Sequence, residues 1–188
     1  MDDITLSAAP VLGTDIAIAE NRIVERADLA LVSIATPLNG ATALTTALRT
    51  QWKLPMPTAR QCTVKGNMRA IKTAPDQIML VFPHEGSNAN ETVQSKLDGA
   101  GYTTEQTDSW FVLEVSGPDT QNALERLCPL DLHQDVFPIN SSGRTNMEHV
   151  SVLLVRVADD QYLMMSPRSS AQSFLHAIQT SFSNVGAT

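Results

Sequence analysis

The second half of this sequence is organised around the stretch Ser116-Gly117-Pro118-Asp119-Thr120-Gln121-Asn122-Ala123-Leu124-Glu125-Arg126-Leu127-Cys128-Pro129-Leu130-Asp131-Leu132-His133. An apolar strand over residues 110–115 leads into it, and Gly117-Pro118 interrupts that strand. Asp119 and Thr120 are suited to begin a helix, because their side-chain oxygens can accept from free backbone N–H groups. Cys128-Pro129 ends that helix, since a residue before proline is pushed out of the helical region.

The rest of the chain shows similar local patterns. Apolar residues at four-residue spacing predict helices over residues 41–52, 90–98 and 169–182. Apolar and β-branched runs predict strands over residues 29–35, 78–82, 103–115, 147–157 and 161–165, with an edge strand at 69–73. Residues 58–68 are predicted to be a polar loop. The strand over 147–157 is apolar on both faces, which favours a central, covered position.

The two halves of the chain have the same order of predicted elements. Residues 76–83, Asp-Gln-Ile-Met-Leu-Val-Phe-Pro, match residues 160–167, Asp-Gln-Tyr-Leu-Met-Met-Ser-Pro, in their Asp, Gln and Pro. Ala43-Leu44 against Ala123-Leu124 is a weaker match. Either the chain is a duplication, or two amphipathic units are similar by chance. The duplication predicts an α+β fold of two related β-α-β-β-α units, ferredoxin-like halves with one shared core.

The domain organisation follows from these patterns. We expect an N-terminal arm over residues 1–28 with a short strand near residues 16–18, a single domain over 29–182 with halves at about 29–102 and 103–182, and a tail over 183–188.

The composition is that of a globular protein with an acidic balance. The 188 residues are 43% hydrophobic, and 13 Lys and Arg against 20 Asp and Glu give a net charge of −7. Lys and Arg are scattered and form no run, which argues against a nucleic-acid protein. We expect no membrane segment and no targeting signal. Cys62 and Cys128 are far apart and outside any CxxC motif, so reduced thiols in the cytoplasm are expected.

The sequence contains no catalytic signature: GxGxxG, GxxxxGK[ST], GxSxG and HExxH are all absent. Cys128, Asp131 and His133 are close together in the sequence. A zinc site needs three or four converging ligands, and a fourth would have to come from Cys62, His149 or another distant residue. A structural role for the three residues is therefore favoured. Cys128 follows a helix, and the C-terminal end of a helix dipole disfavours a thiolate nucleophile. We therefore expect no catalytic residue and no metal on this chain.

Ligand or partner contacts are predicted instead at Arg144, Thr145, Arg156 and Met56. A guanidinium on or near a covered strand needs an anion, either an internal carboxylate (Glu114, Asp131 or Glu148) or a carboxylate from a ligand or another subunit. Aromatic residues and Met are enriched at interfaces, but they fill cores more often. The alternatives of core and interface apply to Trp52, Trp110, Met56, Met79, Met164 and Met165. An interface position is favoured only for Met56, because it lies in a proline-rich loop.

Several of these residues also carry a family resemblance. Gly117-Pro118-Asp119, the run from Leu127 to His133, and Phe137-Pro138 resemble, in this order, the gamma subunit of heterotetrameric sarcosine oxidase. The resemblance extends over roughly residues 30–182 and includes Arg144-Thr145, residues 149–154, Pro167-Arg168-Ser169, and Pro75-Asp76-Gln77 with Pro83.

The resemblance implies a function that the residues alone do not name. It implies a non-catalytic structural subunit of a cytoplasmic complex that oxidatively demethylates sarcosine to glycine, with formation of hydrogen peroxide and methylenetetrahydrofolate. The partners would be alpha, beta and delta subunits, which would hold FAD, FMN, NAD, zinc and tetrahydrofolate. It also implies the fold of the folate-binding aminomethyltransferase domain. The alternatives are a stand-alone folate-binding protein of one-carbon metabolism and an interaction module outside any enzyme.

Overall fold

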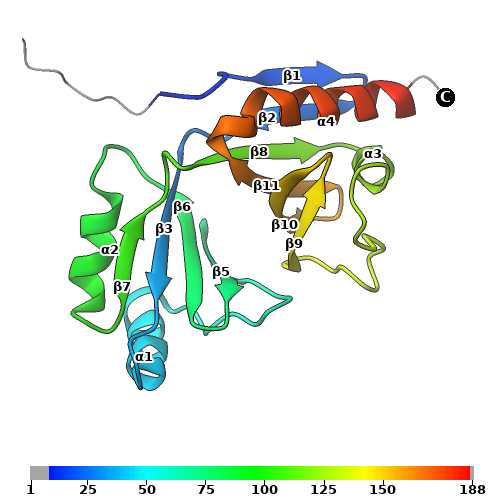
Figure 1. Cartoon of the computed structure of the whole chain (residues 1–188). Helices are drawn as coiled ribbons and strands as arrows, with labels where there is room; N and C mark the ends of the chain where they lie inside the picture. The colour runs from blue at the N-terminus through cyan, green and yellow to red at the C-terminus, as the bar shows by residue number, and fades with distance from the viewer. Residues whose placement is uncertain (1–8, 187–188) are drawn as a thin grey trace, which may run out of the picture.

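The computed structural model describes residues 9–186 and has two antiparallel β-sheets, each with helices on its outer face (Figure 1). This is the α+β class that the sequence predicts. The six-stranded sheet has the order β1 (Asp15–Ile18), β2 (Asn21–Glu25), β8 (Trp110–Ser116), β11 (Gln161–Pro167), β10 (Val150–Ala158) and β9 (Ser142–Met147). The five-stranded sheet has the order β4 (Thr63–Lys65), β5 (Met68–Ala74), β6 (Gln77–Pro83), β3 (Leu29–Ala35) and β7 (Tyr102–Glu105).

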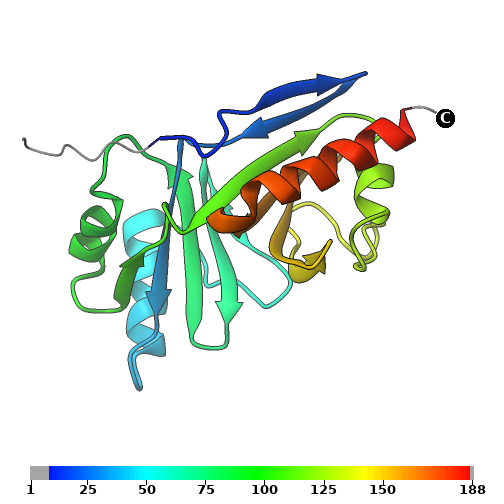
Figure 2. The same cartoon turned by 45° about the horizontal axis from the view of Figure 1, so that its top comes forward.

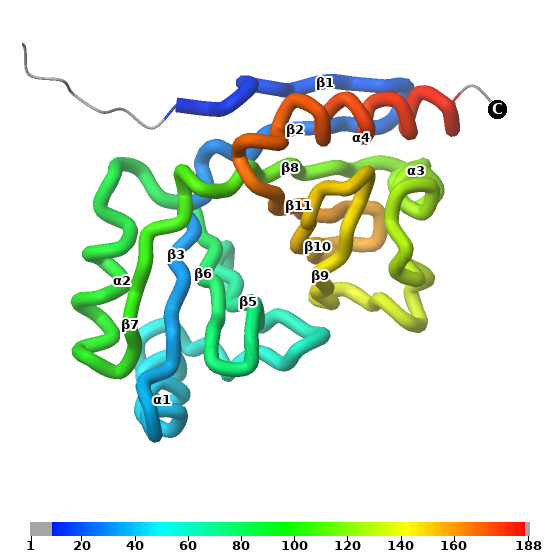
Figure 3. Tube along the Cα trace, in the orientation of Figure 1, coloured from blue at the N-terminus to red at the C-terminus, as the bar shows by residue number. Residues whose placement is uncertain are grey.

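Within residues 9–186, four α-helices cover the outer faces of these sheets. They are α1 (Ala41–Trp52), α2 (Ala89–Leu97), α3 (Thr120–Glu125) and α4 (Ala171–Val185), the last preceded by the short 3-10 helix η1 (Arg168–Ser170). Figure 2 shows α1 and α2 beside one sheet and α3 and α4 beside the other. The β1–β2 hairpin runs alongside α4, with which β1 is in contact (Figure 3).

Apolar side chains form three layers between these elements. The outer layer of the five-stranded sheet packs Leu44 and Leu48 of α1, with Val93 of α2, on alternate strand residues. The outer layer of the six-stranded sheet packs α3 and α4 in the same way. Between the sheets, the opposite set of strand residues meets: Leu29, Leu31, Ile71, Met79, Val81, Val112, Leu153, Val155, Leu163 and Met165. Because side chains alternate along a strand, both faces of each sheet are buried, as predicted for the strand over 147–157. That strand is β10, and it begins at Val150, since Met147 ends β9.

The two sheets exchange strands. Strand β2 belongs to the six-stranded sheet, where it pairs with β8, but the chain then enters β3 of the five-stranded sheet. Strand β7 does the reverse: it pairs with β3 and then leads into β8. The predicted strand over 103–115 is therefore wrong as one element. Residues 106–109 form a turn, closed by Ser109 N–H donating to the Gln106 carbonyl at 3.0 Å, and each side of the turn joins a different sheet.

Matching pairs of strands have matching registers. In the β5–β6 pair, Ala70 lies opposite Leu80, and the register shifts between Lys72 and Ala74. In the β10–β11 pair, Leu154 lies opposite Met164, and the register shifts between Arg156 and Ala158. In the β5–β6 pair the shift comes just before the turn into segment 76–83, and in the β10–β11 pair it comes just before the turn into segment 160–167. The same irregularity at the same place in both sheets is a similarity of structure as well as of sequence.

Two loops join the sheets directly. Gln61 and Ser141 form an isolated antiparallel bridge. On either side of it, Cys62 N–H donates to the Asn140 carbonyl at 2.9 Å, and Ser142 N–H donates to the Arg60 carbonyl at 2.9 Å. These hydrogen bonds hold the segment before β4 against the segment before β9.

The structure corrects several predictions. Strands β4 and β9 were missed, and β5 is not at the edge of its sheet, because β4 covers it. Residues 15–25 of the predicted arm form β1 and β2, and Ile23 of β2 is fully buried, while residues 1–8 of that arm lie outside the described part of the chain. Helix α4 extends to Val185, beyond its predicted end, and residues 187–188 of the predicted tail are not described. No helix among residues 9–186 is long and apolar enough to span a membrane.

Candidate functional site

A hollow of about 240 Å³ lies where the β5 bulge approaches the edge strand β9. We call it the basic hollow, and it is lined by Ala59, Lys72, Thr73, Ala74, Pro75, Gly143, Arg144 and Leu153. Arg144 is exposed and Lys72 is half-buried, and neither forms an ion pair or a side-chain hydrogen bond with any of residues 9–186. Leu153, Ala74 and Pro75 give the hollow apolar walls. Two cations without a counter-charge beside an apolar wall can accept a carboxylate.

A second hollow of about 230 Å³, the polar hollow, contains a carboxylate that is already paired. Its lining includes Arg26, Asn67, Arg69, Glu114 and Gln161. The Glu114 carboxylate forms an ion pair with Arg26 and accepts a hydrogen bond from Gln161 Nε2 at 2.6 Å. Hydrogen bonds from Arg26 hold the pKa of Asp28 below its usual range, and those to Asp28 and Glu114 raise the pKa of Arg26. Both carboxylate oxygens of Glu114 are therefore already engaged and are not free for a ligand.

Arg156 is buried, with 3% of its surface exposed, and binds backbone carbonyls. Its Nη1 donates to the carbonyls of Leu132 and Phe137 at 3.3 and 3.1 Å, and its Nη2 donates to that of Asp159 at 2.6 Å. The guanidinium carbon lies 5.5 Å from the centre of the Tyr162 ring. The predicted internal carboxylate partner is thus wrong: the residue 130–140 loop supplies neutral dipoles to this cation, and Arg156 holds that loop on β10.

Thr145 lies on β9 beside Cys128, and both are buried. Burial raises the pKa of the Cys128 thiol, opposed by hydrogen bonds from the Leu130 backbone and the Thr145 side chain. A raised pKa keeps the thiol protonated at neutral pH, in line with the argument against a nucleophile. His133 is exposed, and its backbone N–H donates to Asp131 Oδ1 at 2.9 Å, which is a local turn. Among residues 9–186, no three His, Cys, Asp or Glu side chains gather in a group that could hold a metal.

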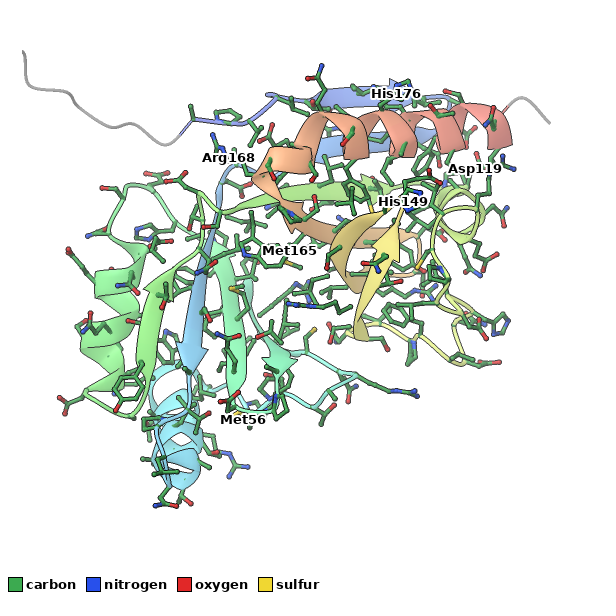
Figure 4. The ribbon with its side chains drawn as sticks, viewed as in Figure 1. Met56, Asp119, His149, Met165, Arg168 and His176 are labelled. Atoms are coloured by element: carbon green, nitrogen blue, oxygen red, sulfur yellow. The ribbon has the colours of Figure 1, made fainter. Side chains whose placement is uncertain are left out.

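Met56 is half-buried and packs on the α1–α2 side of the five-stranded sheet. Figure 4 shows it at the far end of the molecule from Arg168 and His176, and Met165 between the two sheets. Met79, Met164 and Met165 are buried core residues. A partner contact at Met56 stays a prediction.

The sequence analysis missed one charge pattern. Residues 29–75 contain six of the 13 Lys and Arg and none of the 20 Asp and Glu. Counting charges by segment, rather than searching for runs, would have found it. Exposed apolar side chains were missed too: Leu38 is 94% exposed and Tyr102 is 69% exposed.

Comparisons with solved structures define the class of fold first. Aminomethyltransferase T of the glycine cleavage system from Bartonella henselae matches with a TM-score of 0.61 and 13% identity, over 89% of this chain and 47% of that one. A chain of heterotetrameric sarcosine oxidase from Corynebacterium sp. U-96, in complex with pyrrole 2-carboxylate, matches with a TM-score of 0.79 and 21% identity, over 93% of this chain and 90% of that one. The fold is therefore of the kind found in both proteins.

Sequence comparisons then point to one group of proteins. The sarcosine oxidase gamma subunit of Corynebacterium sp. (strain P-1) is 28% identical over 102 residues, which is 54% of this chain and 50% of that protein. The gamma subunit of an Arthrobacter species is 27% identical over 126 residues, which is 67% of this chain and 61% of that protein. The matched part thus spans about half to three-fifths of these relatives. No family model matches the chain. The predicted resemblance to sarcosine oxidase gamma subunits is confirmed.

Proposed function

We propose that this chain is the gamma-type subunit of a heterotetrameric sarcosine oxidase, in which it has a structural and not a catalytic role. The observation that carries the proposal is the match to a chain of that heterotetramer over nearly the full length of both chains. Similarity to three curated gamma subunits supports it from sequence. The complex would be cytoplasmic and would oxidatively demethylate sarcosine to glycine, with hydrogen peroxide and methylenetetrahydrofolate as further products.

The chemistry of this chain supports a structural role. Both thiols are buried with raised pKa, Glu114 is committed to Arg26 and Gln161, and Arg156 is committed to carbonyl groups. In this proposal FAD, FMN, NAD, zinc and tetrahydrofolate are bound by the alpha, beta and delta subunits.

The folate-binding alternative has weaker support. A folate site needs a concave pocket with a carboxylate for the pterin and cations for the glutamate tail. Of the two hollows described above, the polar hollow has both, but its carboxylate is engaged, and its 230 Å³ is below the roughly 300–1,000 Å³ of typical ligand pockets. If the purified chain binds tetrahydrofolate saturably at concentrations up to millimolar, this alternative is restored.

We also propose that the two halves are related ferredoxin-like units that have exchanged their first strands. The common β-bulge position, the matching 76–83 and 160–167 segments and the bridge between Gln61 and Ser141 support this relationship.

The subunit proposal is tested by affinity purification of the tagged chain from the organism that encodes it. We expect two larger chains with flavin absorbance to co-purify, and the eluate to form hydrogen peroxide when sarcosine is added. An untagged strain is the control for carry-over. A colourless chain that elutes alone at low salt contradicts the proposal.

A further inference from the structure

The cations of this acidic protein are unevenly placed. The net charge is −7, yet the segment 29–75 has no acidic residue. Its cations are Arg49, Lys53, Arg60, Lys65, Arg69 and Lys72. None of them forms an ion pair with residues 9–186, whereas Arg22, Arg26 and Arg168 each pair with an Asp. Asp76, which follows the segment at the β5–β6 turn, also forms no ion pair within the described residues.

The fold brings one further cation, Arg144 of β9, next to this segment. The Arg60 carbonyl accepts from Ser142 N–H at 2.9 Å, which brings the segment against β9 and therefore close to Arg144. Ala59, the neighbour of Arg60, lines the basic hollow together with Lys72 and Arg144. Arg60 and Arg144 are exposed and Lys72 is half-buried, so the positive charge of the hollow faces solvent.

The shape of the basic hollow limits what it can receive. Its volume of about 240 Å³ suits a side chain better than a cofactor-sized ligand. The apolar wall of Leu153, Ala74 and Pro75 can cover the methylenes of that side chain, while Arg144 can bind a carboxylate through two parallel N–H groups. A nucleic acid is disfavoured, because the net charge of −7 repels a polyanion at long range.

We propose that the basic hollow, next to Arg60 in the chain, is the docking point for an acidic side chain on one of the larger subunits. This inference rests on the proposed function and adds to it the part of the surface that meets the partner. Exposed cations at a rim act mainly by steering the encounter and by opposing wrong partners. Association through this surface is then weakened by salt, since the screening length falls from about 30 Å at 0.01 M to about 8 Å at 0.15 M ionic strength.

The test uses the tagged full-length chain purified with its partners. Arg144→Glu and Lys72→Glu are compared with the unchanged chain for the amount of flavin-containing chains retained across a salt series. The matched control is Lys96→Glu, which reverses an exposed charge on α2, outside the segment and the hollow. Circular dichroism and urea unfolding of each purified variant show that it is folded.

We expect each hollow variant to retain at least about tenfold less partner at physiological salt, and the control to retain as much as the unchanged chain. Retention of partner by Arg144→Glu and Lys72→Glu at the level of the control overturns this inference and leaves the proposed function standing. An unchanged chain that retains no flavin-containing partner overturns both. Saturable binding of a labelled single-stranded oligonucleotide, abolished by Arg144→Glu, makes the hollow a nucleic-acid site and also overturns the inference.

Discussion

Asn21 and Asp119 exchange two hydrogen bonds although they are 98 residues apart. Asn21 Nδ2 donates to Asp119 Oδ2 at 2.9 Å, and the Asp119 backbone N–H donates to Asn21 Oδ1 at 3.0 Å. The β1–β2 turn is thereby fixed to the start of α3. The prediction that the Asp119 side chain caps α3 is wrong, because its carboxylate accepts from Asn21 instead of from the helix.

Replacement of Asn21 tests this connection. Asn21 is 2% exposed and Asp119 is half-buried, so Asn21→Ala leaves the Asp119 N–H and one carboxylate oxygen without their partners at a partly buried place. We expect a loss of about 1–3 kcal/mol in the free energy of unfolding, measured by urea denaturation. Gln94→Ala, at an exposed position on α2, should change it by less than about 0.5 kcal/mol. Equal effects of the two variants would show that the Asn21–Asp119 exchange contributes nothing.

Gly117 allows Asn21 to reach Asp119. Gly117 has φ +125°, and a Cβ there would lie 2.5 Å from Asn21 Oδ1 and 2.8 Å from the Glu20 carbonyl oxygen. Gly117→Ala therefore combines backbone strain with a steric clash, and we expect it to cost about 3 kcal/mol or more. The control is Gly66→Ala, where φ is +57° and nothing lies within 4 Å of the new Cβ. It should cost only about 1–2 kcal/mol, the strain alone. Similar thermal unfolding of the two variants would contradict the clash.

Arg156 is expected to be a main support of the residue 130–140 loop. Arg156→Met has a similar length but leaves the carbonyls of Leu132, Phe137 and Asp159 without their charged donor. The expected loss is at least about 2 kcal/mol, with faster hydrogen exchange in residues 130–140. Arg144→Met, at an exposed arginine without a partner among the described residues, should stay within about 0.5 kcal/mol of the unchanged chain. Unchanged exchange in the loop of Arg156→Met would show that the loop is held by other contacts.

The two buried thiols predict a loss of stability in alkali. Burial raises the pKa of Cys62 and Cys128 above the ordinary 9.0. Their contribution is fully present below the pKa of the unfolded thiol and is lost as the pH rises through the higher folded pKa, because the unfolded state releases its protons first. The free energy of unfolding from urea titrations should therefore fall as the pH rises past the ordinary thiol pKa of 9.0. Burial also raises the pKa of Tyr162, which adds to the fall above pH 10.

The matched variant for this pH dependence carries Cys62→Ala and Cys128→Ala together. It should be less stable than the unchanged chain at pH 7.5, because two buried side chains lose volume, but its stability should decline less steeply with pH. Parallel curves for the two proteins would exclude the thiols as the cause.

Local sequence was sufficient for the elements that carry their own pattern. Helix α1 and strand β3 have the predicted bounds, and α2 lies within one residue of them. Leu44 and Leu48 are both fully buried, as their four-residue spacing requires. A sequence match between the two halves was also visible, because Asp-Gln recurs where the chain turns into β6 and β11, and Pro recurs where each of these strands ends. These signals depend on residues close in sequence, for which periodicity and turn chemistry are sufficient.

Short polar strands were not visible in the same way. Strand β9, Ser-Gly-Arg-Thr-Asn-Met, has no apolar alternation and exists because β10 offers it an edge. Strand β2 is placed by its pairing with β8 in the six-stranded sheet, although the next strand along the chain, β3, belongs to the five-stranded sheet. Strand pairing over long separations is decided by backbone hydrogen bonds and burial, which leave little trace in the local sequence of an edge strand.

The sequence by itself determined the α+β class, the main helices and core strands, and the resemblance to sarcosine oxidase gamma subunits. Tertiary structure alone decided which charges meet. It gave Arg156 a set of carbonyl oxygens where a carboxylate was expected, and it brought Lys72 of one sheet to the same hollow as Arg144 of the other. The physical reason is that an ionic or polar contact depends on distance and desolvation in space, and both are set only when the two sheets pack.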